Sequence, residues 1–109
     1  MRTLHLTLKA QWYNMIEQGI KKEEYREDKD YWKKRLCRSK GLCDYGGYCA
    51  MFCCQNIHHD FDAVCFHYGY TSRTMTFKIE GISIGTGKPE WGAEVGRKYF
   101  VIKLGDKID

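Results

Sequence analysis

Three charged residues near the start of the chain have the types and spacing to handle a polar, anionic ligand. Lys21, Glu24 and Arg26 lie in the stretch GIKKEEYRE, residues 19–27. If this stretch is a strand, Glu24 and Arg26 point to one face, about 7 Å apart at the backbone. The carboxylate can then fix the guanidinium and leave donors free for a phosphate or a base edge. Lys21 follows the helix-ending Gly19, where a turn can direct its side chain into the same cleft. Burial there would favour the neutral amine, which could then act as a base. A solvent-exposed strand of mixed charge is the alternative interpretation.

A second group of cations follows this stretch. Residues 33–40, KKRLCRSK, contain five cations and no acid, and begin with Lys33, Lys34 and Arg35. The chain as a whole has a formal net charge of +4. A cluster of this kind can attract phosphates through counterion release, although it can equally serve solubility. The charge distribution is therefore compatible with contact to nucleic acid or a nucleotide, and equally with a purely solubilising role.

The glycine-rich stretch GTGKPEWG, residues 85–92, resembles a phosphate loop only superficially. A P-loop requires a glycine five residues before the Gly-Lys pair and Ser or Thr after it, and this stretch has neither. We interpret it as a loop joining two strands. Trp91 in this loop offers a flat surface for stacking a base, and Glu90 and Glu94 bring carboxylates beside it.

Residues 37–60 form a cysteine-rich segment whose thiols could bind a structural zinc ion. The spacings are irregular and contain no Cys-x-x-Cys pair, so free thiols in a partly buried loop are the alternative. No other cofactor is expected. The predicted zinc ligands are Cys37, Cys43, Cys49 and Cys53, with Cys54, His58 and His59 in the same segment.

Hydrophobic periodicity places these residues on a small set of elements. Alternating leucines at residues 4–8 predict a strand, and residues 10–19 follow the spacing of a helix that ends at Gly19. Residues 21–27 are expected to form a strand with Lys21 on the face opposite Glu24. A short helix is expected to begin after Asp28 or Asp30.

Three further strands are expected in the second half of the chain. Val64, Phe66 and Tyr68 alternate, and the apolar phase of residues 75–84 shifts at Gly81, where a β-bulge is expected. A last strand buries Phe100, Ile102 and Leu104. Five strands with two short helices predict an α+β fold, in the form of a curved sheet or a partly closed barrel of five to six strands.

The overall composition is that of a single globular domain. The chain has 109 residues, of which 43% are hydrophobic and 29% charged. The opening residues contain no long apolar run, so we expect neither a secretory signal nor a membrane span. Cysteines in such a chain are expected to be thiols or metal ligands rather than disulfides, which predicts a cytoplasmic protein.

Gly19, Lys21, Glu24 and Arg26 match the GxKxxExR signature of the ASCH domain family, which is related to the PUA RNA-binding fold. The flanking stretches LHLTLKAQWYNMIEQG, YWKKRL, GKPEWGAE and YFVIKLG are similar to those of small single-domain members. The resemblance covers residues 3–36 and 61–109 and leaves residues 37–60 as an insertion. It implies one ASCH-like domain over residues 1–109, built as a PUA-like barrel with the signature residues lining a cleft.

The resemblance implies two functions. The first is binding of RNA or a nucleotide, with Arg26 and Lys22 contacting phosphate, Glu24 orienting Arg26, and Trp91 or Tyr70 stacking a base.

The second function resembles that of an amidohydrolase branch that removes the acetyl group from acetylated cytidine by means of a lysine, a threonine and a glutamate. Lys21 occupies the lysine position, and Glu24 stands where the threonine nucleophile is expected. Glu24 would therefore act as a general base through water. Glu90 and Glu94 are the nearest residues for the third role.

Overall fold

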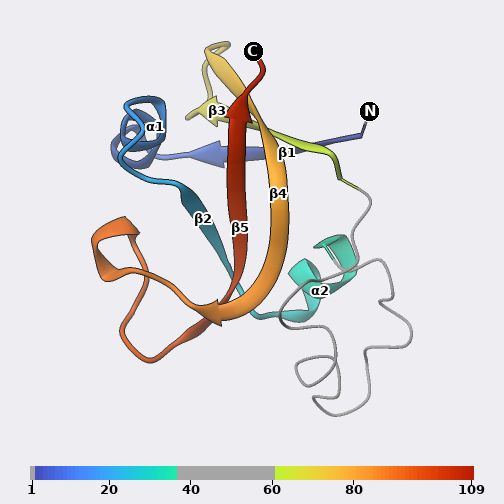
Figure 1. Ribbon diagram of the computed structural model, residues 1–109, viewed down its shortest axis with the longest axis vertical. Helices are drawn as coiled ribbons and strands as arrows, with labels where there is room; N and C mark the ends of the chain where they lie inside the picture. The colour runs from blue at the N-terminus through green and yellow to red at the C-terminus, as the bar shows by residue number, and fades with distance from the viewer. Residues whose placement is uncertain (1, 37–60) are drawn as a thin grey trace.

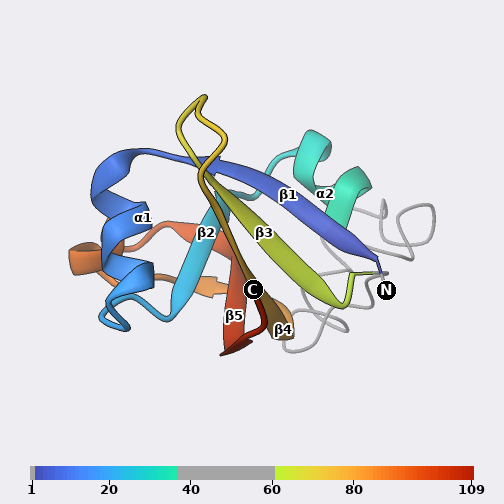
Figure 2. The ribbon, with the colours of Figure 1, turned by 90° about the horizontal axis from the view of Figure 1, so that it is seen from above.

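Five strands form one curled, mixed sheet. The computed structural model describes residues 2–36 and 61–109, and the strand order is β1-β3-β4-β5-β2 (Figure 1). Strands β1 and β3 are parallel, whereas the other three neighbouring pairs are antiparallel. The strands are β1 (Thr3–Leu8), β2 (Glu23–Glu27), β3 (Ala63–Tyr68), β4 (Thr74–Thr86) and β5 (Lys98–Lys107). This confirms the prediction of an α+β fold with a partly closed sheet, which curls around its core in Figure 2.

The core fills the concave side of the sheet, as the period-2 patterns predict. Leu4 and Leu6 on β1 pack with Val64 and Phe66 on β3, and all four are at most 4% exposed. Phe100 on β5 is fully buried in the same cluster. Because alternate residues of a strand face opposite sides, His5 on β1 is left on the outer side.

The long strand β4 changes register where the sequence predicts a bulge. Its pairing with β5 is irregular between Phe77 and Ile79 and again between Ile79 and Gly81. A bulge of this kind bends a strand and increases its twist. It therefore helps β4 to bend, and Figure 1 shows the arched course of this strand.

Helix α1 (Ala10–Glu17) ends in a glycine motif that determines where Lys21 begins. Gly19 has a φ of 79°, the left-handed conformation that favours glycine. Its amide donates to Ile16 O at 3.1 Å, while the amides of Ile20 and Lys21 donate to Met15 O at 3.0 and 3.1 Å. This Schellman arrangement turns the chain sharply back, so that Lys21 lies beside the helix end.

Helix α2 (Asp30–Leu36) begins at one of the two predicted positions and packs Leu36, 1% exposed, into the core. Helix α1 buries Tyr13 together with Ile16. Tyr13 packs edge-on against Tyr68, with ring centroids 5.0 Å apart. Trp12 is only partly buried and is free to contact a ligand site instead.

Strand β5 is covered on both faces, which its alternating pattern did not predict. Tyr99 and Val101 are buried on the convex side by the loop between β4 and β5. The glycine-rich stretch is this loop, as predicted, and it contains the 3-10 helix η1 (Pro89–Trp91). An added Cβ at Gly87 would lie 2.7 Å from both the Ala93 Cβ and the Tyr25 ring, so the loop rests directly on β2.

No helix among the described residues is long and apolar enough to cross a membrane.

Candidate functional site

A cavity of about 510 Å³ opens where α1, β2, the start of α2 and the β4–β5 loop meet. Four cations and three carboxylates line it: Lys21, Arg26, Lys29, Arg97, Glu24, Glu27 and Glu94. Its other walls are aromatic apart from one glycine: Trp12, Tyr25, Trp32, Trp91, Tyr99 and Gly92. The volume falls within the usual range for sites that take small molecules.

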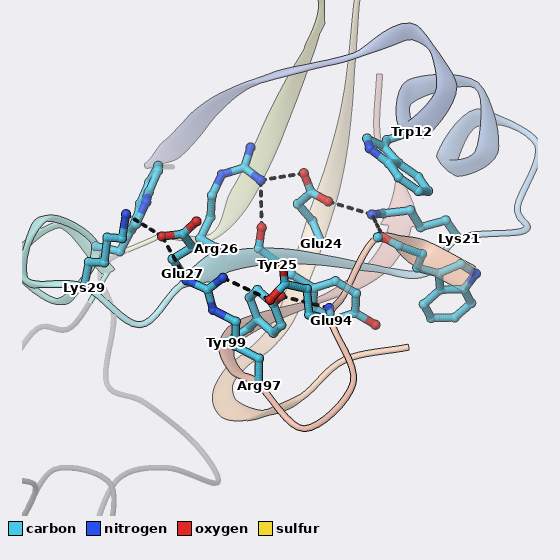
Figure 3. Close-up of a pocket in the computed structure, with 13 residues that line it drawn as sticks. Trp12, Lys21, Glu24, Tyr25, Arg26, Glu27, Lys29, Glu94, Arg97 and Tyr99 are labelled. Atoms are coloured by element: carbon cyan, nitrogen blue, oxygen red, sulfur yellow. Dashed lines mark hydrogen bonds and ion pairs between the residues drawn. The ribbon is translucent and has the colours of Figure 1, made fainter. Parts of the chain in front are cut away.

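The three residues singled out by the sequence form one ion-paired chain at this cavity. The Glu24 carboxylate accepts from Lys21 Nζ at 2.8 Å through Oε1 and from Arg26 Nη1 at 2.7 Å through Oε2 (Figure 3). Lys21 and Glu24 are only 2% and 4% exposed. The expectation that Lys21 lies on the opposite face from Glu24 was wrong. Because β2 begins at Glu23, Lys21 precedes the strand and does not follow its alternation.

The Lys21 ammonium is enclosed by groups that favour a positive charge. Besides Glu24, it donates to the Trp91 carbonyl oxygen at 2.6 Å. It also lies 4.7 Å from the centre of the Trp12 ring and 5.3 Å from that of Tyr25, which are cation–π distances. The Lys21 ammonium therefore contacts helix α1, strand β2 and the β4–β5 loop at once.

Two hydrogen bonds hold the Arg26 guanidinium at one nitrogen. Its Nη1 donates to Glu24 and, at 2.8 Å, to the Tyr25 carbonyl oxygen. Its guanidinium carbon lies 5.5 Å from the centre of the Trp32 ring. Among the described residues, no hydrogen bond of Arg26 uses Nη2 or Nε. A guanidinium fixed in this way presents an oriented pair of donors to an anion.

The outer rim of the cavity is a more exposed charge cluster. Glu27 contacts Lys29 Nζ at 2.5 Å and Arg97 Nη2 at 3.3 Å, and Arg97 also contacts Glu94 at 3.3 Å. The hydrogen bond from Lys29 lowers the pKa of Glu27, and the hydrogen bond to Glu94 raises the pKa of Arg97. Exposed pairs such as these contribute little stability, so a bound anion can compete for the two cations.

Tyr25 anchors the floor of the site to the loop. Its hydroxyl donates to Glu23 Oε1 at 2.8 Å and accepts from the Lys88 amide at 3.0 Å. Burial, with the Glu23 carboxylate adding to it, raises the Tyr25 pKa well above that of a free tyrosine, although the Lys88 amide opposes the shift. The phenol therefore stays neutral and keeps the loop fixed at physiological pH.

The other predicted contact residues are distributed over several surfaces. Trp91 lines the cavity, whereas Lys22 is exposed and lines a second cavity of about 330 Å³ with Glu80 and Asp106. Tyr70 is fully exposed, at 102% of its reference area, in the turn between β3 and β4.

The basic cluster is only partly described. Lys33 and Lys34 belong to α2, and Arg35 on the same helix donates to the Tyr31 hydroxyl and to the His5 carbonyl oxygen, at 3.3 and 3.4 Å. Arg35 does not line the 510 Å³ cavity.

The sequence pattern missed several residues of the site. Trp12, Trp32 and Tyr99 line the cavity, but none of them was predicted as a site residue. Glu94 lines the cavity as well, whereas Glu90, the other suggested carboxylate, does not.

The predicted zinc ligands Cys37, Cys43, Cys49 and Cys53, with Cys54, His58 and His59, lie outside the described residues. Within the described part of the chain, a different group could hold a metal ion: His5, Cys65 and His67.

No family model matches this chain, and searches of curated proteins and of solved structures also returned no match.

Proposed function

We propose that the 510 Å³ cavity binds a nucleotide, either free or as part of a single-stranded RNA, in an ASCH-like domain. The observation that carries the proposal is Arg26, which Glu24 orients and whose Nη2 and Nε are unused among the described contacts. Arginine donors held in this manner suit a phosphate or the edge of a base.

The walls of the cavity support a base as part of the ligand. Trp12, Trp32 and Trp91 offer aromatic rings around a charged floor. Stacking of a base on an aromatic ring contributes about 1–3 kcal/mol and tolerates any base. Arg97 and Lys29 on the rim, rather than Lys22, are the cations placed to share the phosphate charge with Arg26.

The test is RNA binding measured at several salt concentrations, with short single-stranded RNAs and with nucleoside monophosphates. Loss of a charged hydrogen bond costs about 1.5–3 kcal/mol, so Arg26→Ala should weaken binding about 10- to 150-fold. It should also make the plot of log affinity against log salt shallower by about 0.7 for each phosphate that the variant no longer neutralises. Arg26→Lys should keep the salt dependence while losing affinity, because it keeps the charge without the oriented donors.

Arg73→Ala is the matched control, because it removes the same charge from a residue that lines neither cavity. It should bind RNA as the unaltered protein does. Binding that is absent, insensitive to salt, or reduced equally by Arg73→Ala and Arg26→Ala would refute the proposal.

The buried Lys21–Glu24 pair supports a second candidate function, hydrolysis of acetylated cytidine. No Ser, Thr or Cys lines the cavity among the described residues, so water would be the nucleophile. Glu24 would take a proton from the water as its oxygen bonds to the acetyl carbon, and Lys21 would stabilise the oxyanion. The C–N bond then breaks, the proton passes to the amine nitrogen, and acetate and cytidine leave.

Release of cytidine from acetylcytidine, with Lys21→Ala as the comparison, tests this second function. The unaltered protein should release cytidine, and Lys21→Ala should not do so above the uncatalysed rate. Equal rates for the two proteins would exclude hydrolysis and leave the binding function standing.

A further inference from the structure

Two histidines and a cysteine meet on the outer side of the sheet, away from the charged cavity. His5 Nδ1 lies 3.0 Å from His67 Nε2, and Cys65 Sγ lies 3.9 Å from the same nitrogen. The three potential ligand atoms all lie within 4.8 Å of one another. None of the three residues lines either described cavity.

The strand pairing brings these residues together. His5 on β1 is the register partner of Cys65 on β3, and His67 follows two positions later on the same face. The inward-facing neighbours Leu4 and Phe66 are fully buried, which fixes the backbone of both strands. The three side chains therefore project from a rigid platform, and little ordering is needed to bring them to one ion.

The types of these side chains indicate which ion they suit. A thiolate and two imidazoles are ligands for zinc, and three protein ligands leave a fourth tetrahedral position open. Zn–N bonds of about 2.05 Å and a Zn–S bond of about 2.3 Å at tetrahedral angles place the two nitrogens about 3.3 Å apart and sulfur about 3.6 Å from nitrogen. The observed separations of 3.0 and 3.9 Å differ from these values by only a few tenths of an ångström, which small side-chain rotations can supply.

We propose that His5, Cys65 and His67 bind one Zn²⁺ ion, with water as the fourth ligand. Cys65 is 8% exposed, so the sulfur lies at the base of the site, whereas His5 is exposed and His67 is half-buried. The open side of the site thus faces solvent, where a water ligand fits. The thiolate leaves the bound ion with a single net positive charge. This site is separate from the cysteine set predicted by the sequence in residues 37–60.

Two sets of variants of the full chain, without an affinity tag, distinguish these two locations for zinc. Cys65→Ser and His5→Gln each remove a ligand of the proposed site. The comparison variant keeps Cys65 as the one cysteine and changes the other five to serine: Cys37, Cys43, Cys49, Cys53 and Cys54. Thr7→Ala is the matched control, because Thr7 is an exposed residue on the same face of β1 as His5.

Zinc affinity is measured by competition with a chelator, and Co²⁺ replaces zinc to report thiolate ligation through its charge-transfer absorption. Removing a residue that hydrogen-bonds to a metal ligand lowers metal affinity about 10- to 100-fold. Cys65→Ser removes a ligand itself, so it should weaken zinc binding at least about a hundredfold. It should also abolish the cobalt–thiolate absorption at this site. The one-cysteine variant and Thr7→Ala should retain both the affinity and the absorption.

His5→Gln keeps the test decisive if Cys65→Ser does not fold, because the His5 side chain is exposed and lies outside the core. It should weaken zinc binding without lowering the thermal midpoint of the metal-free protein. The proposal is overturned if the one-cysteine variant binds no zinc and shows no cobalt–thiolate absorption. It is also overturned if His5→Gln binds zinc as tightly as Thr7→Ala, in which case His5 and His67 form only an imidazole–imidazole hydrogen bond.

Discussion

Neutralising Glu24 should destabilise the fold far more than removing its lysine partner. Glu24→Gln keeps the shape of the side chain and removes the charge that two cations share. Lys21 would then remain as a buried cation, 2% exposed, with only neutral groups beside it: the new side-chain amide, the Trp91 carbonyl and two aromatic rings. Removing one partner of a buried pair costs about 3–5 kcal/mol, and we expect Glu24→Gln to fall in this range.

Lys21→Met should cost less, because Glu24 would still accept from Arg26 Nη1 at 2.7 Å. The carboxylate therefore keeps a cationic partner, whereas Lys21 in the other variant does not. The double variant should be more stable than Glu24→Gln alone, because it leaves no unpaired buried ammonium. The non-additivity expected for residues in direct contact is about 0.5–3 kcal/mol.

Urea unfolding followed by circular dichroism gives the free energy of unfolding for the two single variants and the double variant. The slopes against urea should match that of the unaltered protein, since the same surface is exposed on unfolding. A cost for Lys21→Met equal to or greater than that for Glu24→Gln would refute the reasoning. So would a cost for Glu24→Gln below about 1 kcal/mol, the value expected of an exposed ion pair.

Two further predictions concern the loop that covers the site. Gly87→Ala places a methyl group 2.7 Å from its neighbours and should cost about 1–3 kcal/mol in urea unfolding, whereas Gly85→Ala, which meets nothing within 4 Å, should be neutral or slightly stabilising. Equal effects of the two substitutions would contradict the close packing of the loop. Because the folded-state pKa of Tyr25 is raised above the unfolded value of 10.0, the stability it contributes is fully present below pH 10 and is lost as pH rises toward the folded-state pKa. Above pH 10 the unfolding free energy should fall less steeply in Tyr25→Phe than in the unaltered protein, by up to about 1.4 kcal/mol per pH unit, and equal slopes for the two proteins would contradict this prediction.

The parts of the fold that depend on local patterns could be predicted from the sequence. Leu4, Leu6 and Leu8 alternate because their strand has one buried face, and Gly19 ends α1 because the chain needs a left-handed residue there. The irregularity around Gly81 also lies where the apolar phase changes. In each case a few neighbouring residues contain the whole signal.

The contacts of Lys21 and Arg26 with Glu24 could be predicted only in part. The i, i+2 spacing correctly placed Arg26 beside Glu24. The position of Lys21 depends on where the strand begins, and element boundaries are the least certain part of a pattern. A lysine two residues before a strand can turn to either face, and here the hydrogen bond to Trp91 in a distant loop decides which one.

Contacts between residues far apart in the sequence could not be predicted, because neither segment contains a pattern that names its partner. His5 and Cys65 become neighbours only because β1 and β3 pair in parallel, and no motif in either strand specifies this pairing. Likewise, the tryptophans of the cavity come from α1, α2 and the β4–β5 loop, so Trp12 and Trp32 resemble ordinary core residues in the sequence. The zinc prediction for residues 37–60 stays a prediction.

The pairing of β2 with β5 has a consequence for how the protein is made on the ribosome. β5 comes well after β2 in the chain, and it is the neighbour of β2 in the sheet. During translation the segment that carries Glu24 and Arg26 therefore emerges before β5, and it has no strand to pair with on this side until β5 has been made. The high charge of β2 protects the unpaired strand during this interval, because charged strands resist association with other chains. A nascent or truncated chain that stops before residue 98 would contain every signature residue and still have no cleft.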